Sequence, residues 1–185
     1  MSGISRQLPR LMIAAPKSGS GKTMICCGLL QALNENMKMS AFKCGPDYID
    51  PMFHQTVLGV PSKNLDTFFT DENTTRYLMA EGADGRDMAL VEGVMGYYDG
   101  LGGTQPEGSS YDLSLKTQTP AVLVIDGKGA SLSILAQIKG FLGFRTDQQI
   151  RAVILNRTSK GVYERLAPLI EGELGVKAAG YVPQT

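Results

Sequence analysis

Residues 16–23 read Pro-Lys-Ser-Gly-Ser-Gly-Lys-Thr, directly after the apolar run Leu11–Ala15 and directly before a helical pattern. Small residues leave the backbone free to wrap its N–H groups around phosphate oxygens, and the following helix turns its positive dipole end toward them. Lys22 adds a positive charge, and Thr23 adds a hydroxyl ligand for Mg²⁺. The stretch predicts a phosphate-binding loop with nucleotide contacts from Lys17, Ser18, Gly19, Ser20, Gly21, Lys22 and Thr23.

Length and composition predict one compact domain over residues 1–185. The formal net charge is +0 and no basic run occurs, which argues against nucleic acid as a partner. Cys26, Cys27 and Cys44 have neither a metal-ligand nor a disulfide-framework spacing, so we expect a cytoplasmic protein. No apolar run approaches membrane-spanning length, and we expect no membrane partner.

Strand and helix signals alternate along the chain. The expected strands, several of them continuously apolar, are Leu11–Ala15, Ala41–Cys44, Met88–Glu92, Ala121–Asp126, Ala152–Asn156 and Ala178–Val182. Helical patterns cover 26–37, 71–81, 132–142 and 163–174. This alternation, with a phosphate loop after the first strand, predicts a three-layer, doubly wound, mostly parallel α/β sheet. Ligands should gather at the carboxyl ends of its strands.

The first of three clusters at expected strand ends is Lys43-Cys44-Gly45-Pro46-Asp47-Tyr48-Ile49-Asp50-Pro51. Gly and Pro stop the strand there and should leave Asp47 and Asp50 in a loop beside the phosphate site. A carboxylate in this place can hold Mg²⁺ directly or through water, although aspartates are equally common as turn and cap residues. His54 follows closely, and we interpret it as a local structural hydrogen-bonding residue rather than a catalyst.

The second cluster, Glu92-Gly93-Val94-Met95-Gly96-Tyr97-Tyr98-Asp99-Gly100, follows an apolar run. An acid at this place contacts Mg²⁺ or orients a nucleophile in many nucleotide-binding folds, and a solvated strand-end glutamate is the alternative. The glycines that continue to Gly103 suit a loop that closes over a substrate. Farther along, Ser109 either caps a short helix or helps to bind an anion.

The third cluster is Val153-Ile154-Leu155-Asn156-Arg157. An asparagine just past a late strand can bind a purine edge, because its amide offers both a donor and an acceptor. Asparagine is equally common in turns. Both interpretations of Asn156 stay open on the sequence.

Together these stretches resemble the ATP-binding synthetase domain of the cobyrinate a,c-diamide synthase family, which is akin to dethiobiotin synthetase and has a P-loop NTPase fold. The resemblance runs from about Leu11 to the last residue, and its most specific part is Gly-Pro-Asp-Tyr-Ile-Asp-Pro at 45–51. Pro16, which replaces the first glycine of the common phosphate loop, is usual in this family. The family's glutamine amidotransferase domain is absent from these 185 residues. We therefore expect a single synthetase domain, or one served by a separate amidotransferase chain.

The resemblance implies an ATP-dependent carbon–nitrogen ligase of cobalamin biosynthesis. ATP phosphorylates the a and c side-chain carboxylates of a corrinoid, cobyrinate, and ammonia displaces phosphate from each acyl phosphate. The implied cofactors are ATP and Mg²⁺, and the implied ammonia source is a glutamine amidotransferase domain or subunit. A homodimer is compatible with this family.

The same resemblance assigns roles to residues of this chain. The residues expected to be catalytic are Lys43, Asp47, Asp50 and Glu92. The expected Mg²⁺ ligands are Thr23, Asp47 and Glu92. Lys43 is expected to steady the transferring phosphoryl group or the substrate carboxylate. The side chains expected to face the substrate are Tyr98, Ser109 and Asp50. The side chain expected to contact adenine is that of Asn156.

A different class of protein stays open. Lys17 lies five residues before Lys22, which is the spacing of the signature lysine in the deviant phosphate loops of partitioning and division-site ATPases. Those ATPases are switches that dimerise around ATP, and they need no Gly-Pro-Asp-Tyr-Ile-Asp-Pro loop. Nearer alternatives are a dethiobiotin-synthetase-like ligase and a diamide synthase for another tetrapyrrole, such as a nickel sirohydrochlorin.

Overall fold

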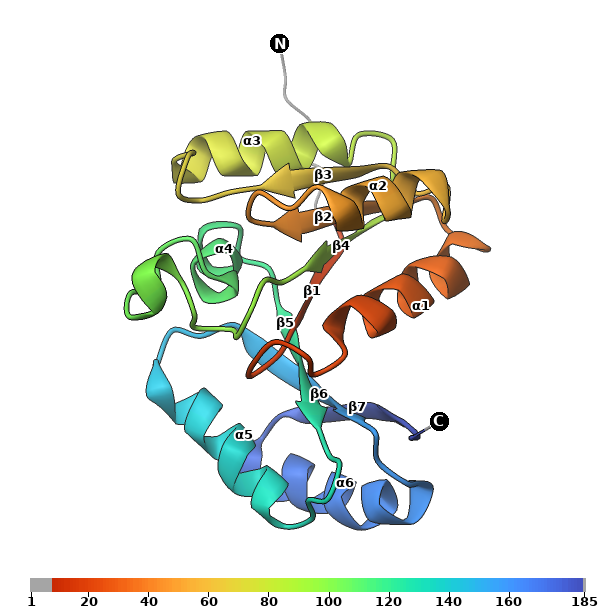
Figure 1. Ribbon diagram of the computed structural model, residues 1–185, viewed down its shortest axis with the longest axis vertical. Helices are drawn as coiled ribbons and strands as arrows, with labels where there is room; N and C mark the ends of the chain where they lie inside the picture. The colour runs from red at the N-terminus through yellow and green to blue at the C-terminus, as the bar shows by residue number, and fades with distance from the viewer. Residues whose placement is uncertain (1–7, 185) are drawn as a thin grey trace.

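A parallel sheet forms the centre of the molecule (Figure 1). The computed structural model describes residues 8–184. In that part of the chain seven strands, all parallel, pair in the order β3-β2-β4-β1-β5-β6-β7. The strands are β1 (Arg10–Ala14), β2 (Met39–Cys44), β3 (Ser62–Leu65), β4 (Met88–Glu92), β5 (Ala121–Asp126), β6 (Ile150–Asn156) and β7 (Lys177–Val182).

Helices cover both faces of the sheet. The helices are α1 (Lys22–Asn34), α2 (Ile49–Thr56), α3 (Glu72–Gly82), α4 (Ser110–Lys116), α5 (Ser133–Phe144) and α6 (Lys160–Leu174), with a short 3₁₀ turn at Leu101–Gly103. Buried side chains of α1 share one hydrophobic cluster with one face of the central strands, whereas those of α3 to α6 share a second cluster with the other face. This arrangement confirms the predicted three-layer, doubly wound α/β fold. None of the helices described is long and apolar enough to cross a membrane.

All six expected strands are present, with ends that differ by no more than two residues from the predicted ones. Two elements were not predicted. Strand β3 has only four residues, and its polar centre, Lys63 and Asn64, is exposed, so it lacks the apolar run of a central strand. Helix α2 occupies part of the stretch that we expected to be a loop. Its Pro51 lies in the first turn, where a helix tolerates proline because the missing N–H has no partner there in any case.

The strand order reverses direction next to β1. From β1 the chain crosses through α1 to β2, beyond β4, and later passes from β4 through α4 to β5 on the opposite side of β1. In open parallel sheets such a switch point leaves a crevice at the carboxyl ends of the strands, where ligands bind. The phosphate loop follows β1 directly and therefore lies at this crevice.

Tyr97 ties the loop after β4 to the rest of the core. Its backbone N–H donates to the carbonyl of Ala15 at 2.8 Å, and its own carbonyl accepts from the N–H of Tyr111 at 2.8 Å. Its buried hydroxyl pairs with Ser114 Oγ at 2.9 Å and accepts from the N–H of Gln149 at 3.1 Å. The backbone and the hydroxyl of one residue thus connect the start of the phosphate loop, α4 and the turn before β6.

Tyr97→Phe should lower the free energy of unfolding by about 1–2 kcal/mol, because the Gln149 N–H loses its acceptor and Ser114 Oγ loses one of its two partners. Chemical denaturation followed by circular dichroism measures this change. Tyr77→Phe is the matched control, since Tyr77 is 68% exposed and the same loss of a hydroxyl there should leave stability unchanged. Equal stability of the two variants would contradict the role given to the Tyr97 hydroxyl.

Candidate active site

The phosphate loop has the backbone of an anion-binding turn. Gly19 and Gly21 adopt φ of 77° and 97°, a left-handed conformation that disfavours residues with a Cβ. Ser20 is buried and its hydroxyl donates to the carbonyl of Lys17 at 3.0 Å, which closes the turn. Helix α1 begins at Lys22, so its free N–H groups point into the turn. Lys17, Ser18 and Gly19 are exposed at the mouth of the loop.

Two residues at the end of β6 brace this loop from behind. Asn156 Nδ2 donates to the carbonyl of Ser20 at 2.8 Å, and its Oδ1 accepts from the N–H of Arg157 at 3.0 Å. The Arg157 guanidinium donates to the carbonyl of Gly19 at 2.6 Å and to Asp126 Oδ2 at 2.9 Å. Asn156 is fully buried with both amide groups engaged, so the structure shows it as a support of the loop. The expected adenine contact stays a prediction that this arrangement does not favour.

Lys22 lies inside the loop rather than at its surface. The residue is 8% exposed, and its Nζ donates to the carbonyl of Met95 at 2.6 Å. Burial lowers the pKa of its ammonium group, and the charge of Lys43 lowers it further, whereas Glu92 opposes the change. Met95 has a φ of 43°, uncommon for a residue with a side chain, and no sequence signal indicated its contact with Lys22.

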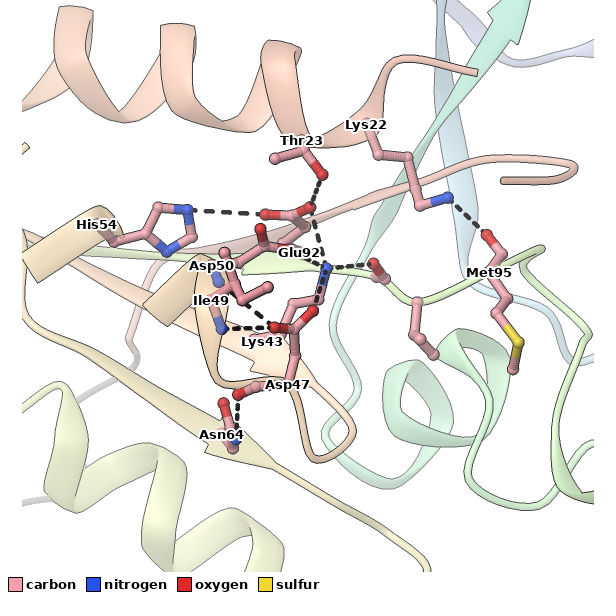
Figure 2. Close-up of polar contacts among 12 residues, drawn as sticks. Lys22, Thr23, Lys43, Asp47, Ile49, Asp50, His54, Asn64, Glu92 and Met95 are labelled. Carbon is pink, nitrogen blue, oxygen red and sulfur yellow. Dashed lines mark hydrogen bonds and ion pairs between the residues drawn. The ribbon is translucent and has the colours of Figure 1, made fainter. Parts of the chain in front are cut away.

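Lys43 and Glu92 occupy directly paired positions on β2 and β4. The Lys43 Nζ donates to Glu92 Oε1 at 3.0 Å and to Asp50 Oδ2 at 2.6 Å, and it lies 3.8 Å from Asp47 Oδ2 (Figure 2). Burial would lower the pKa of Lys43, but the carboxylates of Glu92 and Asp50 outweigh it and raise the pKa. The carboxylates therefore favour the charged form of Lys43, which lies among three acids. The predicted catalytic residues come together here.

The two aspartates of this cluster lie around the start of α2. Asp47 is in the loop before the helix, as expected, whereas Asp50 is inside the helix. Asp47 Oδ1 accepts from the N–H groups of Ile49 at 2.8 Å and Asp50 at 3.4 Å, as a capping residue does. Its other oxygen faces Lys43. Asp50 lies in the first helical turn, where the positive end of the helix dipole favours a carboxylate. Asp47 thus has the turn contacts that the sequence allowed, and its part in holding Mg²⁺ stays a prediction.

Glu92 is fully buried beneath the phosphate loop. Its Oε1 accepts from the Thr23 hydroxyl at 2.5 Å as well as from Lys43. Burial raises the pKa of the Glu92 carboxyl, and Lys43 and the Thr23 hydroxyl offset part of the increase. Its Oε2 faces His54 Nε2 at 3.6 Å, while His54 Nδ1 lies 3.2 Å from Ser62 Oγ. Burial lowers the pKa of the imidazole, which keeps His54 neutral.

The loop and the charged cluster open into one cavity of about 480 Å³. Its walls come from the phosphate loop, the start of α2 and the segment after β4. The lining residues are Ser18, Gly19, Gly21, Lys22, Thr23, Met24, Lys43, Asp47, Asp50, Gly93, Val94 and Met95. The cavity therefore presents phosphate-binding amides and two lysines opposite a group of carboxylates.

Tyr98 and Ser109 do not line this cavity. The Tyr98 hydroxyl donates to the carbonyl of Phe141 at 2.7 Å, and its ring stacks on the Phe141 ring. Ser109 is buried, and its Oγ accepts from the N–H of Asp112 at 3.1 Å as the cap of α4. The structure thus gives both side chains structural partners, and the capping interpretation of Ser109 is confirmed. A substrate contact for either side chain stays a prediction without geometric support.

Fold and site define a phosphate-loop nucleotide-binding α/β domain. The chain belongs to the CobQ/CobB/MinD/ParA nucleotide binding domain family, whose model matches residues 11–185. This match agrees with the resemblance stated from the motifs.

The relatives and one solved structure refine the comparison. The chain is 42% identical over 178 residues to the cobyrinate a,c-diamide synthase of Thermoplasma acidophilum, covering 95% of this chain and 40% of that one. It is 39% identical to the hydrogenobyrinate a,c-diamide synthase of Mycobacterium tuberculosis, covering 94% and 39%. The chain thus spans about two fifths of the length of these relatives. The signal recognition particle receptor FtsY from Elizabethkingia anophelis superposes with a TM-score of 0.65 over 98% of this chain and 61% of that one, and its 15% identity shows a likeness of fold alone.

Lys22→Ala should weaken ATP binding about 10- to 100-fold, because hydrogen bonds to charged groups contribute roughly 1.5–3 kcal/mol. Calorimetric titration of the folded variant measures the affinity. Lys177→Ala is the matched control, since Lys177 is an exposed lysine at the start of β7 that does not line the cavity. Unchanged affinity in Lys22→Ala would refute its assignment to the phosphates.

Proposed function

We propose that this chain is the ATP-dependent amidation domain of a cobyrinate a,c-diamide synthase. One observation carries the proposal: the phosphate loop with Lys22 and the charged cluster around Lys43 face the same cavity. A nucleotide bound on the loop would present its terminal phosphate to that cluster. This chain spans about two fifths of the length of its relatives, and their names support a corrinoid as the acceptor.

The reaction activates a carboxylate, which is a poor acyl donor. A carboxylate oxygen of the substrate attacks the γ-phosphorus of ATP, the bond to ADP breaks, and an acyl phosphate forms. Ammonia then attacks the acyl carbon, inorganic phosphate leaves with the electron pair of the C–O bond, and a proton is lost to give the amide. The protein contributes positioning and charge neutralisation to both steps.

Lys43 is the residue best placed to neutralise the reacting groups. Its ammonium group is fixed by Glu92 and Asp50 from the sheet and from α2, and it lines the cavity. A charge that is held before the substrate arrives costs no reorganisation when the phosphoryl group moves. Asp50 bonds Lys43 and also lines the cavity, and we assign it a contact with the substrate.

The cluster also fits Mg²⁺. The Thr23 hydroxyl and a Glu92 oxygen lie 2.5 Å apart, and Asp47 and Asp50 add carboxylates beside the single ammonium group of Lys43. Oxygen ligands with excess negative charge are those that Mg²⁺ prefers. Thr23, Asp47 and Glu92 would hold the ion, which would neutralise charge on the ATP phosphates.

A nucleotide-dependent switch is the alternative function. Lys17 is exposed at the mouth of the loop, as a lysine directed toward another molecule would be. A switch, however, gives no reason to line the cavity of the phosphate loop with Lys43, Asp47 and Asp50, nor to pair Lys43 with the buried Glu92. This cluster favours the ligase.

In this proposal a glutamine amidotransferase domain or subunit provides the ammonia. The substrate is cobyrinate or a close corrinoid such as hydrogenobyrinate. We place the reaction in the cytoplasm, where free thiols such as Cys26, Cys27 and Cys44 stay reduced. Pairing of two copies is part of the same proposal.

The ligase assignment is tested with the purified chain, ATP, Mg²⁺, an ammonium salt and cobyrinate. We expect ADP release that depends on the corrinoid, and mono- and diamides detected by mass spectrometry. Stimulation of ATP hydrolysis by a protein or a membrane instead of the corrinoid would support the switch.

Asp47→Asn and Glu92→Gln should reduce turnover at limiting Mg²⁺ far more than they reduce nucleotide binding. Each keeps the side-chain shape and removes the negative charge, so the loss is electrostatic. Glu81→Gln is the control, because Glu81 forms an exposed salt bridge with Lys63 away from the cavity. Wild-type turnover of both site variants would contradict the metal assignment.

This chain alone should not release glutamate from glutamine. Glutamine hydrolysis needs an accessible cysteine thiolate beside a base. Burial raises the pKa of Cys44 to about 12 and that of Cys26 well above its ordinary value, and the one histidine faces Glu92. Glutamate assays with glutamine, ATP, Mg²⁺ and a corrinoid acid check this. Release that disappears in Cys44→Ser would reveal a glutaminase site.

A further inference from the structure

Two buried polar atoms face each other beneath the site without a hydrogen-bond partner. They are His54 Nε2 and Glu92 Oε2, which lie 3.6 Å apart (Figure 2). Both residues are 0% exposed. An unsatisfied buried donor or acceptor costs free energy comparable to a lost hydrogen bond. A small movement that brings these two atoms within hydrogen-bond distance would satisfy both of them.

The other polar atoms of the two side chains have partners already. Glu92 Oε1 accepts from the Thr23 hydroxyl and from Lys43 Nζ. His54 Nδ1 lies within hydrogen-bond distance of Ser62 Oγ. If Ser62 donates to Nδ1, the ring proton is on Nε2 and points at Glu92. The opposite tautomer would set a nitrogen lone pair against a carboxylate oxygen, so the Nε2–H form is the one that suits this pocket.

We propose that His54 is a positioning residue for Glu92. The terminal torsion of a glutamate side chain is broad, so a carboxylate held through one oxygen alone can turn. Donation from His54 Nε2 to Oε2 fixes that oxygen and thereby keeps Oε1 directed at Thr23, Lys43 and the metal position. The inference rests on the proposed function, because it assigns Oε1 to Mg²⁺. It gives His54 more than the local structural role expected from the sequence.

Cys26 is the third potential ligand in this pocket. Its Sγ, a ring nitrogen of His54 and a Glu92 oxygen lie within 4.8 Å of one another, a grouping that could hold a soft metal ion. A metal there would need the Cys26 thiolate, and burial instead favours the thiol. A metal-binding trio is therefore the competing outcome of the test below.

The tautomer can be measured directly, because the chain has one histidine. Long-range ¹H–¹⁵N spectra of the folded wild-type protein, with Mg²⁺ and a non-hydrolysable ATP analogue, identify which ring nitrogen carries the proton, because Nε2 couples to both carbon-bound ring protons. We expect the proton on Nε2. A proton on Nδ1 would overturn the proposal, and this result needs no variant to fold.

Variants test the consequence for Mg²⁺. His54→Leu should raise the Mg²⁺ concentration needed for tight nucleotide binding by about 10-fold or more, with affinity for ATP in the absence of Mg²⁺ unchanged. His54→Gln keeps an N–H donor near the position of Nε2 and should restore the wild-type Mg²⁺ dependence. Val60→Ala is the packing control. Val60 is buried, and its backbone N–H donates to the carbonyl of His54, but its side chain forms no hydrogen bond with Glu92.

The outcomes separate this inference from the proposed function. Equal Mg²⁺ dependence in His54→Leu and wild type, or an equal shift in His54→Gln, His54→Leu and Val60→Ala, would overturn the positioning role. So would tight binding of Zn²⁺ by the wild type that is lost in Cys26→Ser, because it would assign the trio to a metal. If the wild type binds nucleotide with this His54 effect but never amidates a corrinoid, the ligase proposal fails and the positioning role stands.

Discussion

The salt bridge between Lys43 and Glu92 is the interaction on which the arrangement of the site depends. Both residues are buried at paired positions of adjacent strands, with 3.0 Å between Nζ and Oε1. Removing Lys43 would leave the buried Glu92 carboxylate without a charged partner, and breaking a buried pair in this way costs about 3–5 kcal/mol. The same two side chains bind Thr23 of α1 and Asp50 of α2. Their pairing therefore sets where both helices begin relative to the sheet.

The phosphate loop depends on contacts from segments far away in the sequence. Asn156 and Arg157 hold its carbonyl groups from the end of β6, and the Met95 carbonyl holds Lys22 from the segment after β4. Gly96 packs so closely on the carbonyl of Pro16 that a Cβ at this position would collide with it. A loop held from both sides keeps its N–H groups aimed before the nucleotide arrives, which lowers the ordering cost of binding.

Most of the framework could be predicted from local sequence. The strands can be predicted because burial on both faces of the sheet requires continuous apolar runs. The Gly-Ser-Gly-Lys-Thr turn can be predicted because its left-handed backbone positions favour glycine. Strand β3 and helix α2 were missed since one is short and polar and the other begins with Ile-Asp-Pro. For the same reason Asp50 was expected in a loop beside the phosphate site, whereas the structure has it in the first turn of α2, bonded to Lys43.

The sequence by itself determined that a phosphate loop and three groups of polar residues would meet at the carboxyl edge of a parallel sheet. Only the tertiary structure decided what each side chain faces. Asn156 supports the loop, Tyr98 packs on Phe141, and Glu92 directs one oxygen to Thr23 and the other toward His54. The physical reason is that side-chain partners follow from strand register and from the face that each helix covers. Both are set by long-range packing, and neither is encoded in the spacing of neighbouring residues.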